Sequence, residues 1–119
     1  MAYHGFRRTK RSGMLESELQ PKVLELLEEE GYYAVKIISC NRSGWMDIVA
    51  CSPTGMFVGI ELKVGNNAPS DLQKIHIQEV LKRGGIAFAA WSLADVKEGL
   101  AKGRRDDGTD QIASAPPLL

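Results

Sequence analysis

The sequence contains few cysteines, few aromatic residues and no long apolar run. Of its 119 residues, two are cysteines, Cys40 and Cys51, and 7% are aromatic. Neither cysteine has a second cysteine or a histidine at ligand spacing nearby, so we expect no zinc site. In a cytosolic chain this pattern also excludes a disulfide framework. We predict that both cysteines are small buried hydrophobic side chains.

A membrane-spanning helix needs about 18 or more uncharged apolar residues, and the sequence has no such stretch. The longest uncharged run, from Ile48 to Ile60, is interrupted by Ser52-Pro53-Thr54-Gly55. The basic start of the chain is not followed by an apolar segment, so the sequence predicts no signal peptide. We therefore expect a cytoplasmic protein that does not enter a membrane.

The formal net charge of zero conceals an uneven distribution of charge. The first 13 residues carry four cations and no acid, whereas the rest of the chain carries 11 cations and 15 acids. A basic arm on a mildly acidic body is typical of proteins with a polyanionic partner such as DNA. The alternative is a terminus that only keeps the chain soluble. The candidate DNA-binding residues of the arm are Arg7, Arg8, Lys10 and Arg11.

Apolar residues make up 44% of the chain and charged residues 25%, as in an ordinary globular domain. We divide the chain into a basic arm over 1–13, one folded domain over 14–102 and a loosely ordered tail over 103–119. Residue patterns in the domain predict helices at Leu15–Glu30, from the Ser70 N-cap to Gly84, and from Ser92 to about Leu100. They predict strands at Tyr33–Ser39, Met46–Cys51, Met56–Val64 and Ile86–Trp91. This order, α-β-β-β-α-β-α, predicts an α/β sandwich with a mixed four-stranded sheet flanked by helices.

Three charged side chains on the second and third predicted strands stand out against apolar neighbours. Glu61 and Lys63 lie on one face of the third strand, about 7 Å apart along it. Asp47 lies next to the apolar run of the second strand, where a buried carboxylate is unfavourable unless it is paired or binds a metal. The hairpin places Asp47 beside Glu61. An exposed ion pair of little energetic consequence is the alternative for Glu61 and Lys63.

Two carboxylates and a backbone carbonyl are the oxygen ligands that Mg²⁺ or Mn²⁺ prefers. In that case Lys63 would activate a water or neutralise a phosphate oxygen. Glu16 lies about 50° from the centre of the apolar stripe of the first helix, with Gln20 on the same side. Glu18 instead points to solvent. Glu16 is therefore the acid that could reach into a cleft, although acids at an apolar boundary also occur on plain surfaces.

Gln73 lies in the first turn of the second predicted helix. Its amide and the free backbone N–H groups there could hold a phosphate or a water, and an ordinary exposed glutamine is the alternative. Taken in order, an acid on the first helix, Gly44-x-x-Asp47, Glu61-Leu62-Lys63 and then Gln73 resemble the PD-(D/E)xK nuclease superfamily. The opening segment Glu16–Gln20 and Gln73 resemble the VRR-Nuc family within it, particularly its small standalone phage members. The resemblance covers residues 15 to about 92.

This resemblance implies a restriction-endonuclease-like fold and a Mg²⁺- or Mn²⁺-dependent DNA endonuclease that hydrolyses phosphodiester bonds. Asp47, Glu61 and the Leu62 backbone carbonyl would hold the metal, and Lys63 would assist the attacking water. The helix-one acid, Glu16 or alternatively Glu18, would complete or orient the metal site. The implied catalytic residues are Glu16, Asp47, Glu61, Lys63 and Gln73, with Gln20 as a weaker candidate. The sequence departs from many superfamily members at Met46, where they have proline.

The resemblance also implies a biological setting and an assembly. Standalone members of this kind look like homodimeric resolvases of branched DNA, such as Holliday junctions, in the cytoplasm of a bacterial or phage-infected cell. Cutting both strands needs two active sites, which a short chain obtains as a two-fold dimer. The alternative function is a noncatalytic DNA-binding module on the same fold.

Overall fold

The structure is a computed structural model of the chain, and it describes residues 15–106. The basic arm with its four candidate DNA-binding cations lies outside these residues. The helices are α1 (Glu16–Glu29), α2 (Asp71–Lys82) and α3 (Leu93–Asp106), and the strands are β1 (Tyr33–Lys36), β2 (Ile48–Cys51), β3 (Phe57–Leu62) and β4 (Ile86–Ala90). No helix among residues 15–106 is both long and apolar enough to cross a membrane.

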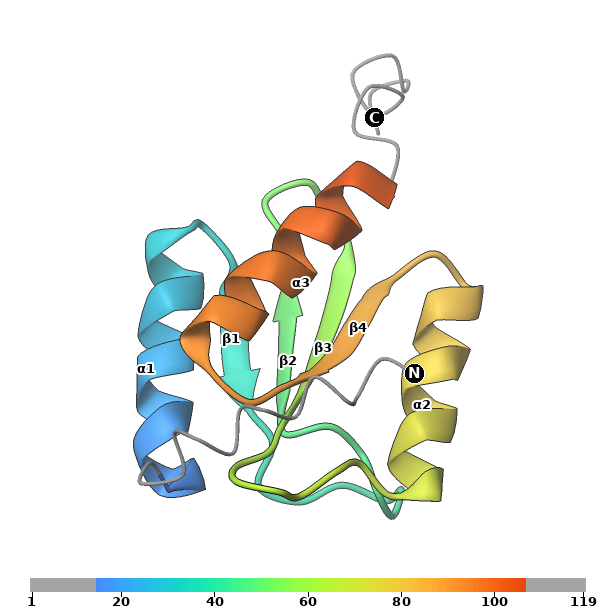
Figure 1. Cartoon of the computed structure of the whole chain (residues 1–119). Coiled ribbons are helices and arrows are strands. Elements are labelled where there is room, and N and C mark those ends of the chain that lie inside the picture. The colour runs from blue at the N-terminus through green and yellow to red at the C-terminus, as the bar shows by residue number, and fades with distance from the viewer. Residues whose placement is uncertain (1–14, 107–119) are drawn as a thin grey trace.

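The strands form one mixed sheet in the order β1-β2-β3-β4. β1, β2 and β3 are antiparallel neighbours, and β4 runs parallel to β3. The turn between β2 and β3 is closed by the Gly55 N–H, which donates to the Ser52 carbonyl at 2.9 Å. α1 and α3 cover one face of the sheet, and α2 covers part of the other (Figure 1). The predicted α/β sandwich and element order are confirmed.

Helices pack against both faces of β3. Its residues Val58, Ile60 and Leu62 are fully buried in the main core under α1 and α3. On the opposite face, Gly59 leaves room for the Met46 side chain, because a Cβ there would lie 2.6 Å from the Met46 sulfur. Glu61 follows Gly59 on this face and is therefore directed toward the α2 side of the sheet.

One end of the sheet gathers the ends of several elements. β1 and β3 run toward this end, and β2 starts from it. The N-termini of α1 and α2 lie at the same end, at the bottom of Figure 1. Because a helix N-terminus carries partial positive charge, this end of the molecule favours anions.

Several boundaries and burials differ from the sequence predictions. α3 continues past Leu100 to Asp106, so residues 103–106 belong to a helix rather than to the predicted tail. β1 ends at Lys36 rather than Ser39, and β2 begins at Ile48 rather than Met46. The prediction that both cysteines are buried is wrong, since Cys40 and Cys51 are exposed. Cys40 lies in the β1–β2 loop. Cys51 is the last residue of β2, and its side chain lies on the α2 side of the sheet, where α2 packs on β3 and β4 but not on β2.

Candidate active site

Asp47 is held at the start of β2 by the neighbouring strand. Its carboxylate oxygen Oδ2 accepts a hydrogen bond from the Leu62 N–H at 2.7 Å. Its backbone carbonyl accepts one from the Ile37 N–H at 2.8 Å. Since Ile48 pairs with Ile60, the chain on each side of that pair brings Asp47 and Glu61 together, as the hairpin predicted.

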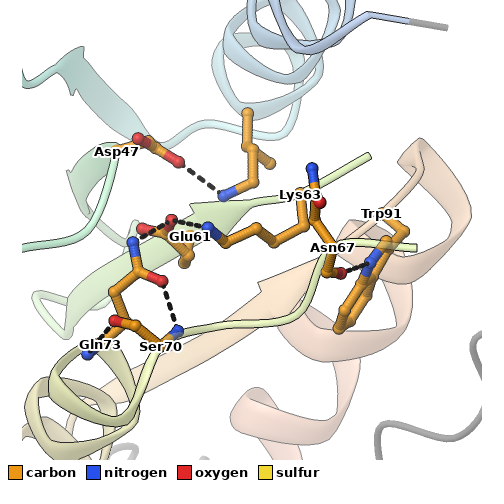
Figure 2. A network of polar contacts seen from close by, with 8 residues as sticks. Asp47, Glu61, Lys63, Asn67, Ser70, Gln73 and Trp91 are labelled. Atoms are coloured by element: carbon orange, nitrogen blue, oxygen red, sulfur yellow. Dashed lines mark hydrogen bonds and ion pairs between the residues drawn. The ribbon is translucent and has the colours of Figure 1, made fainter. Parts of the chain in front are cut away.

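Glu61 is buried, with 2% of its surface exposed. Its oxygen Oε2 accepts a hydrogen bond from the Gln73 side-chain amide at 2.7 Å and lies 3.4 Å from the Lys63 Nζ (Figure 2). Its other oxygen, Oε1, is buried and has no hydrogen-bond partner among the described residues. A buried carboxylate oxygen without a donor is unfavourable by about 1–3 kcal/mol or more, so this atom is suited to a ligand that supplies positive charge.

The pKa values of the carboxyl groups at the site are raised mainly by burial, and the Asp47 carboxylate further raises those of Glu61 and Glu16. The pKa of Glu61 is raised to about 7, first by burial and then by the Asp47 carboxylate, against the lowering effect of the Lys63 ammonium. Burial also raises the pKa of Asp47, opposed mainly by the hydrogen bond from the Leu62 N–H. Such crowding of acids in a partly buried place is typical of functional sites.

The structure separates the two acids of the first helix. Glu16 is half-buried and accepts a hydrogen bond from the Gln20 side chain, and its pKa is raised by burial and by the Asp47 carboxylate. Glu18 is exposed and accepts a hydrogen bond from the Leu15 N–H at 3.0 Å, which caps α1. Geometry therefore places Glu16 beside the carboxylate pair and Glu18 away from it.

Asp47 and Glu61 place two carboxylates, which are hard oxygen donors, next to each other at this site. Among residues 15–106, no three His, Cys, Asp or Glu side chains are placed together closely enough to hold a metal ion. Glu16 therefore lies beside the Asp47–Glu61 pair and does not form a three-carboxylate cage with it. The pair itself fits a divalent cation, because both groups are oxygen ligands and Glu61 Oε1 lacks a partner within the described part of the chain.

Gln73 connects the site to the start of α2. Its side-chain oxygen accepts from the Ser70 N–H at 2.8 Å, while its own N–H donates to the Ser70 hydroxyl at 3.1 Å. This reciprocal cap leaves the Gln73 amide nitrogen free to reach Glu61. The Ser70 N-cap was predicted from the sequence, but the contact between Gln73 and Glu61 was not. It depends on α2 beginning beside the end of β3.

Two side chains that support the site, Trp91 and His76, were not identified as supports from the sequence. The Trp91 indole donates to the Asn67 carbonyl at 2.8 Å and fastens the loop that follows Lys63 (Figure 2). His76 is buried, and its Nε2 donates to the Ser43 carbonyl at 2.9 Å, which ties the loop preceding Asp47 to α2. No motif spacing signals these contacts, because they join segments that meet only in the folded chain.

Lys36 is a further residue near the site that the sequence analysis did not identify. It is the last residue of β1 and pairs with Ile48, next to Asp47. Its positive charge lowers the pKa values of Glu16 and Asp47. The antiparallel pairing of the first two strands is the signal that could have found it, since that pairing brings the end of the first strand beside the start of the second.

Comparison with known proteins supports the fold. No protein-family model matches the chain, and no curated protein matches it. Among solved structures, the chain is similar to one described as a VRR_NUC domain, with 26% sequence identity and a TM-score of 0.63. The match covers 72% of this chain and 94% of that chain. The predicted VRR-Nuc fold, a nuclease-type fold, is therefore confirmed.

Proposed function

We propose that the chain is a divalent-metal-dependent DNA endonuclease that hydrolyses phosphodiester bonds in branched DNA and acts as a homodimer. The observation that carries this proposal is the Glu61 carboxylate. It is buried beside Asp47, one of its oxygens is held by Gln73 and Lys63, and the other has no partner among the described residues. Similarity to a VRR_NUC domain supports the same chemistry.

Mg²⁺ or Mn²⁺ held here would polarise the scissile phosphate and lower the pKa of a bound water. We assign Asp47, Glu61 and the Leu62 backbone carbonyl as its ligands. In an extended strand, the N–H and C=O of one residue point to the same side. Because the Leu62 N–H bonds to Asp47, its carbonyl faces the same space. Glu16 would act from beside this set, through hydration water or through its charge.

The remaining residues act on the ligands and on the substrate. Gln73 holds Oε2 of Glu61, which leaves Oε1 for the metal. The Lys63 side chain is 20% exposed, so its ammonium can also contact DNA. There it would stabilise the negative charge that develops on the phosphate oxygens during hydrolysis. The N-termini of α1 and α2 add positive potential at the same end of the sheet.

Homodimerisation is part of the proposal because paired cuts in a symmetric junction require two active sites. A row of exposed apolar side chains supports it. Tyr33, 81% exposed, is in register with Cys51 and, through it, with Phe57, which is 40% exposed. An apolar patch of this kind on a sheet face commonly marks a protein contact. Analytical ultracentrifugation at micromolar concentration is expected to give twice the mass of one chain.

The deciding experiment is cleavage of labelled duplex, flap, splayed-arm and four-way-junction DNA with Mg²⁺, with Mn²⁺ and with EDTA. We expect metal-dependent cutting of branched forms by the wild-type chain and none by Asp47→Asn. Glu18→Gln is the matched control, since Glu18 lies on the same end of the molecule but faces solvent. Binding without cleavage under all conditions would favour the noncatalytic alternative. Equal cleavage by Asp47→Asn would remove Asp47 from the site.

A further inference from the structure

A cleft of about 520 Å³ lies next to the carboxylate pair, between the first turns of α1 and the end of β1. Lys36 forms one side of it, and the other side is α1. Because Lys36 pairs with Ile48, the cleft borders the segment that carries Asp47. The residues lining it are Glu16, Ser17, Gln20, Pro21, Leu24 and Lys36.

Lys36 supplies a cation at this cleft that acts on the Glu16 and Asp47 carboxylates without forming a close ion pair with either of them. Its side chain is exposed, and among residues 15–106 no carboxylate forms an ion pair with it. Lys63, by contrast, is paired with Glu61. The two lysines therefore differ in role, because one belongs to the carboxylate cluster and the other is available to a ligand.

The lining of the cleft is mostly apolar, and its few polar groups could hold an anionic ligand of modest size. Ser17 offers a side-chain hydroxyl on α1, close to the positive end of that helix, and Gln20, which also donates to Glu16, offers a side-chain amide. Glu16 lines the same cleft, and its carboxylate opposes the entry of an anion. An anion bound here thus depends on Lys36 to offset that charge.

We propose that this cleft binds the phosphodiester group adjacent to the scissile one, with the Lys36 ammonium as its main contact. This subsite rests on the proposed nuclease function. It positions the DNA strand on the α1 side of the carboxylate pair, while Lys63 acts at the scissile phosphate. Lys36 is a positioning residue, because it contacts a phosphate that does not react.

The test is the affinity of the full chain for a fluorescein-labelled 20-base-pair duplex and for a four-way junction, measured by anisotropy over a salt series with Ca²⁺ in place of Mg²⁺. Removal of one phosphate contact lowers the slope of log Kd against log salt by about 0.9, which corresponds to roughly eightfold weaker binding at 0.1 M salt. We expect Lys36→Ala to show this change equally on both DNAs, since a phosphate contact does not read sequence or branching. Lys36→Arg keeps the charge and is expected to restore the slope.

Lys102→Ala is the matched control. Lys102 is exposed, and it lies beside the start of β4, at the end of the sheet opposite the site. Its replacement is expected to leave both Kd and slope unchanged. If the wild-type chain binds DNA and Lys36→Ala shows the same Kd or the same salt slope, the cleft proposal alone is overturned. Absence of DNA binding by the wild-type chain would overturn the cleft and the proposed function together.

Discussion

At the scale of single residues, the carboxyl group of Glu61 is subject to opposing electrostatic effects. Burial and the Asp47 carboxylate favour its protonated form, whereas Lys63 favours the charged form, and the pKa is raised from 4.5 to about 7. In the unfolded chain the group ionises near 4.5. Between these values the folded chain retains a proton that the unfolded chain has released, so the stability of the metal-free protein falls as pH rises through this range.

Glu61→Gln is expected to remove this pH dependence. A shift of this size corresponds to about 3 kcal/mol. At pH 8 the metal-free Glu61→Gln variant should therefore melt several degrees above the wild-type chain, and the difference should shrink toward pH 5. Thermal denaturation in EDTA at both pH values measures this, with exposed Glu18→Gln as control. A variant that melts below the wild-type chain at pH 8 would contradict the assignment of Glu61 as a destabilising buried charge.

Lys63 acts at the same scale, on the chemical step. Its ammonium lies 3.4 Å from Glu61 Oε2 and remains partly exposed. Removal of one positive group that faces developing charge lowers the rate by roughly 100-fold or more. We expect Lys63→Ala to slow single-turnover cleavage at saturating enzyme by this order, beyond any loss of DNA affinity from one phosphate contact. An unchanged single-turnover rate would exclude Lys63 from the mechanism.

At the scale of elements, the N-terminus of α2 has two functions that can be separated. Ser70 caps the helix, and Gln73 both caps it and orients Glu61. Removal of such a cap destabilises a protein by about 1 kcal/mol. We expect Ser70→Ala and Gln73→Ala to lower Tm by similar amounts. Only Gln73→Ala should also weaken Mn²⁺ binding, by roughly 10- to 100-fold, as removal of a group that orients a metal ligand does.

Melting curves and Mn²⁺ titrations of the two variants make this comparison. Equal metal affinity in both variants would show that the amide contact to Glu61 has no part in holding a ligand. Equal weakening in both would assign the effect to the helix start as a whole.

The elements also show what the sequence could predict. The helical spacing of leucines and the Gly31 that follows them predicted α1. The Ser-Pro-Thr-Gly turn predicted the β2–β3 hairpin. Both signals are local in the sequence. The hairpin then brought Asp47 to Glu61. Contacts such as Gln73 with Glu61 depend on how α2 docks on the sheet, and no local pattern encodes that.

The error at Cys51 has the same origin. Its position in an apolar strand predicts burial, but burial also requires an element on that face of the sheet. α2 packs on β3 and β4, so the α2-side face of β1 and β2 keeps exposed residues, among them Tyr33 and Val35. Local hydrophobicity therefore predicted the strand correctly, but it predicted wrongly that the Cys51 side chain is buried by a packed helix.

At the scale of the whole molecule, we expect charge to determine DNA affinity. The four cations within residues 1–13 precede the helix whose N-terminus lies at the site. Deletion of residues 1–13 is expected to weaken DNA binding and to lower the salt slope by about 0.9 for each phosphate that the arm contacts. Anisotropy titrations of both chains across a salt series measure this. Identical affinities at every salt concentration would mean that the arm does not contact DNA.

The proposed function requires that Asp47 and Glu61 together bind one divalent ion. Calorimetric titration of the full chain with Mn²⁺ at pH 8, where Glu61 is mostly ionised, tests it most directly. We expect one Mn²⁺ per chain for the wild-type protein and for Glu18→Gln, and loss of that site in both Asp47→Asn and Glu61→Gln. Mn²⁺ binding that persists in the two variants, or a wild-type chain that binds none, would exclude an ion shared by Asp47 and Glu61.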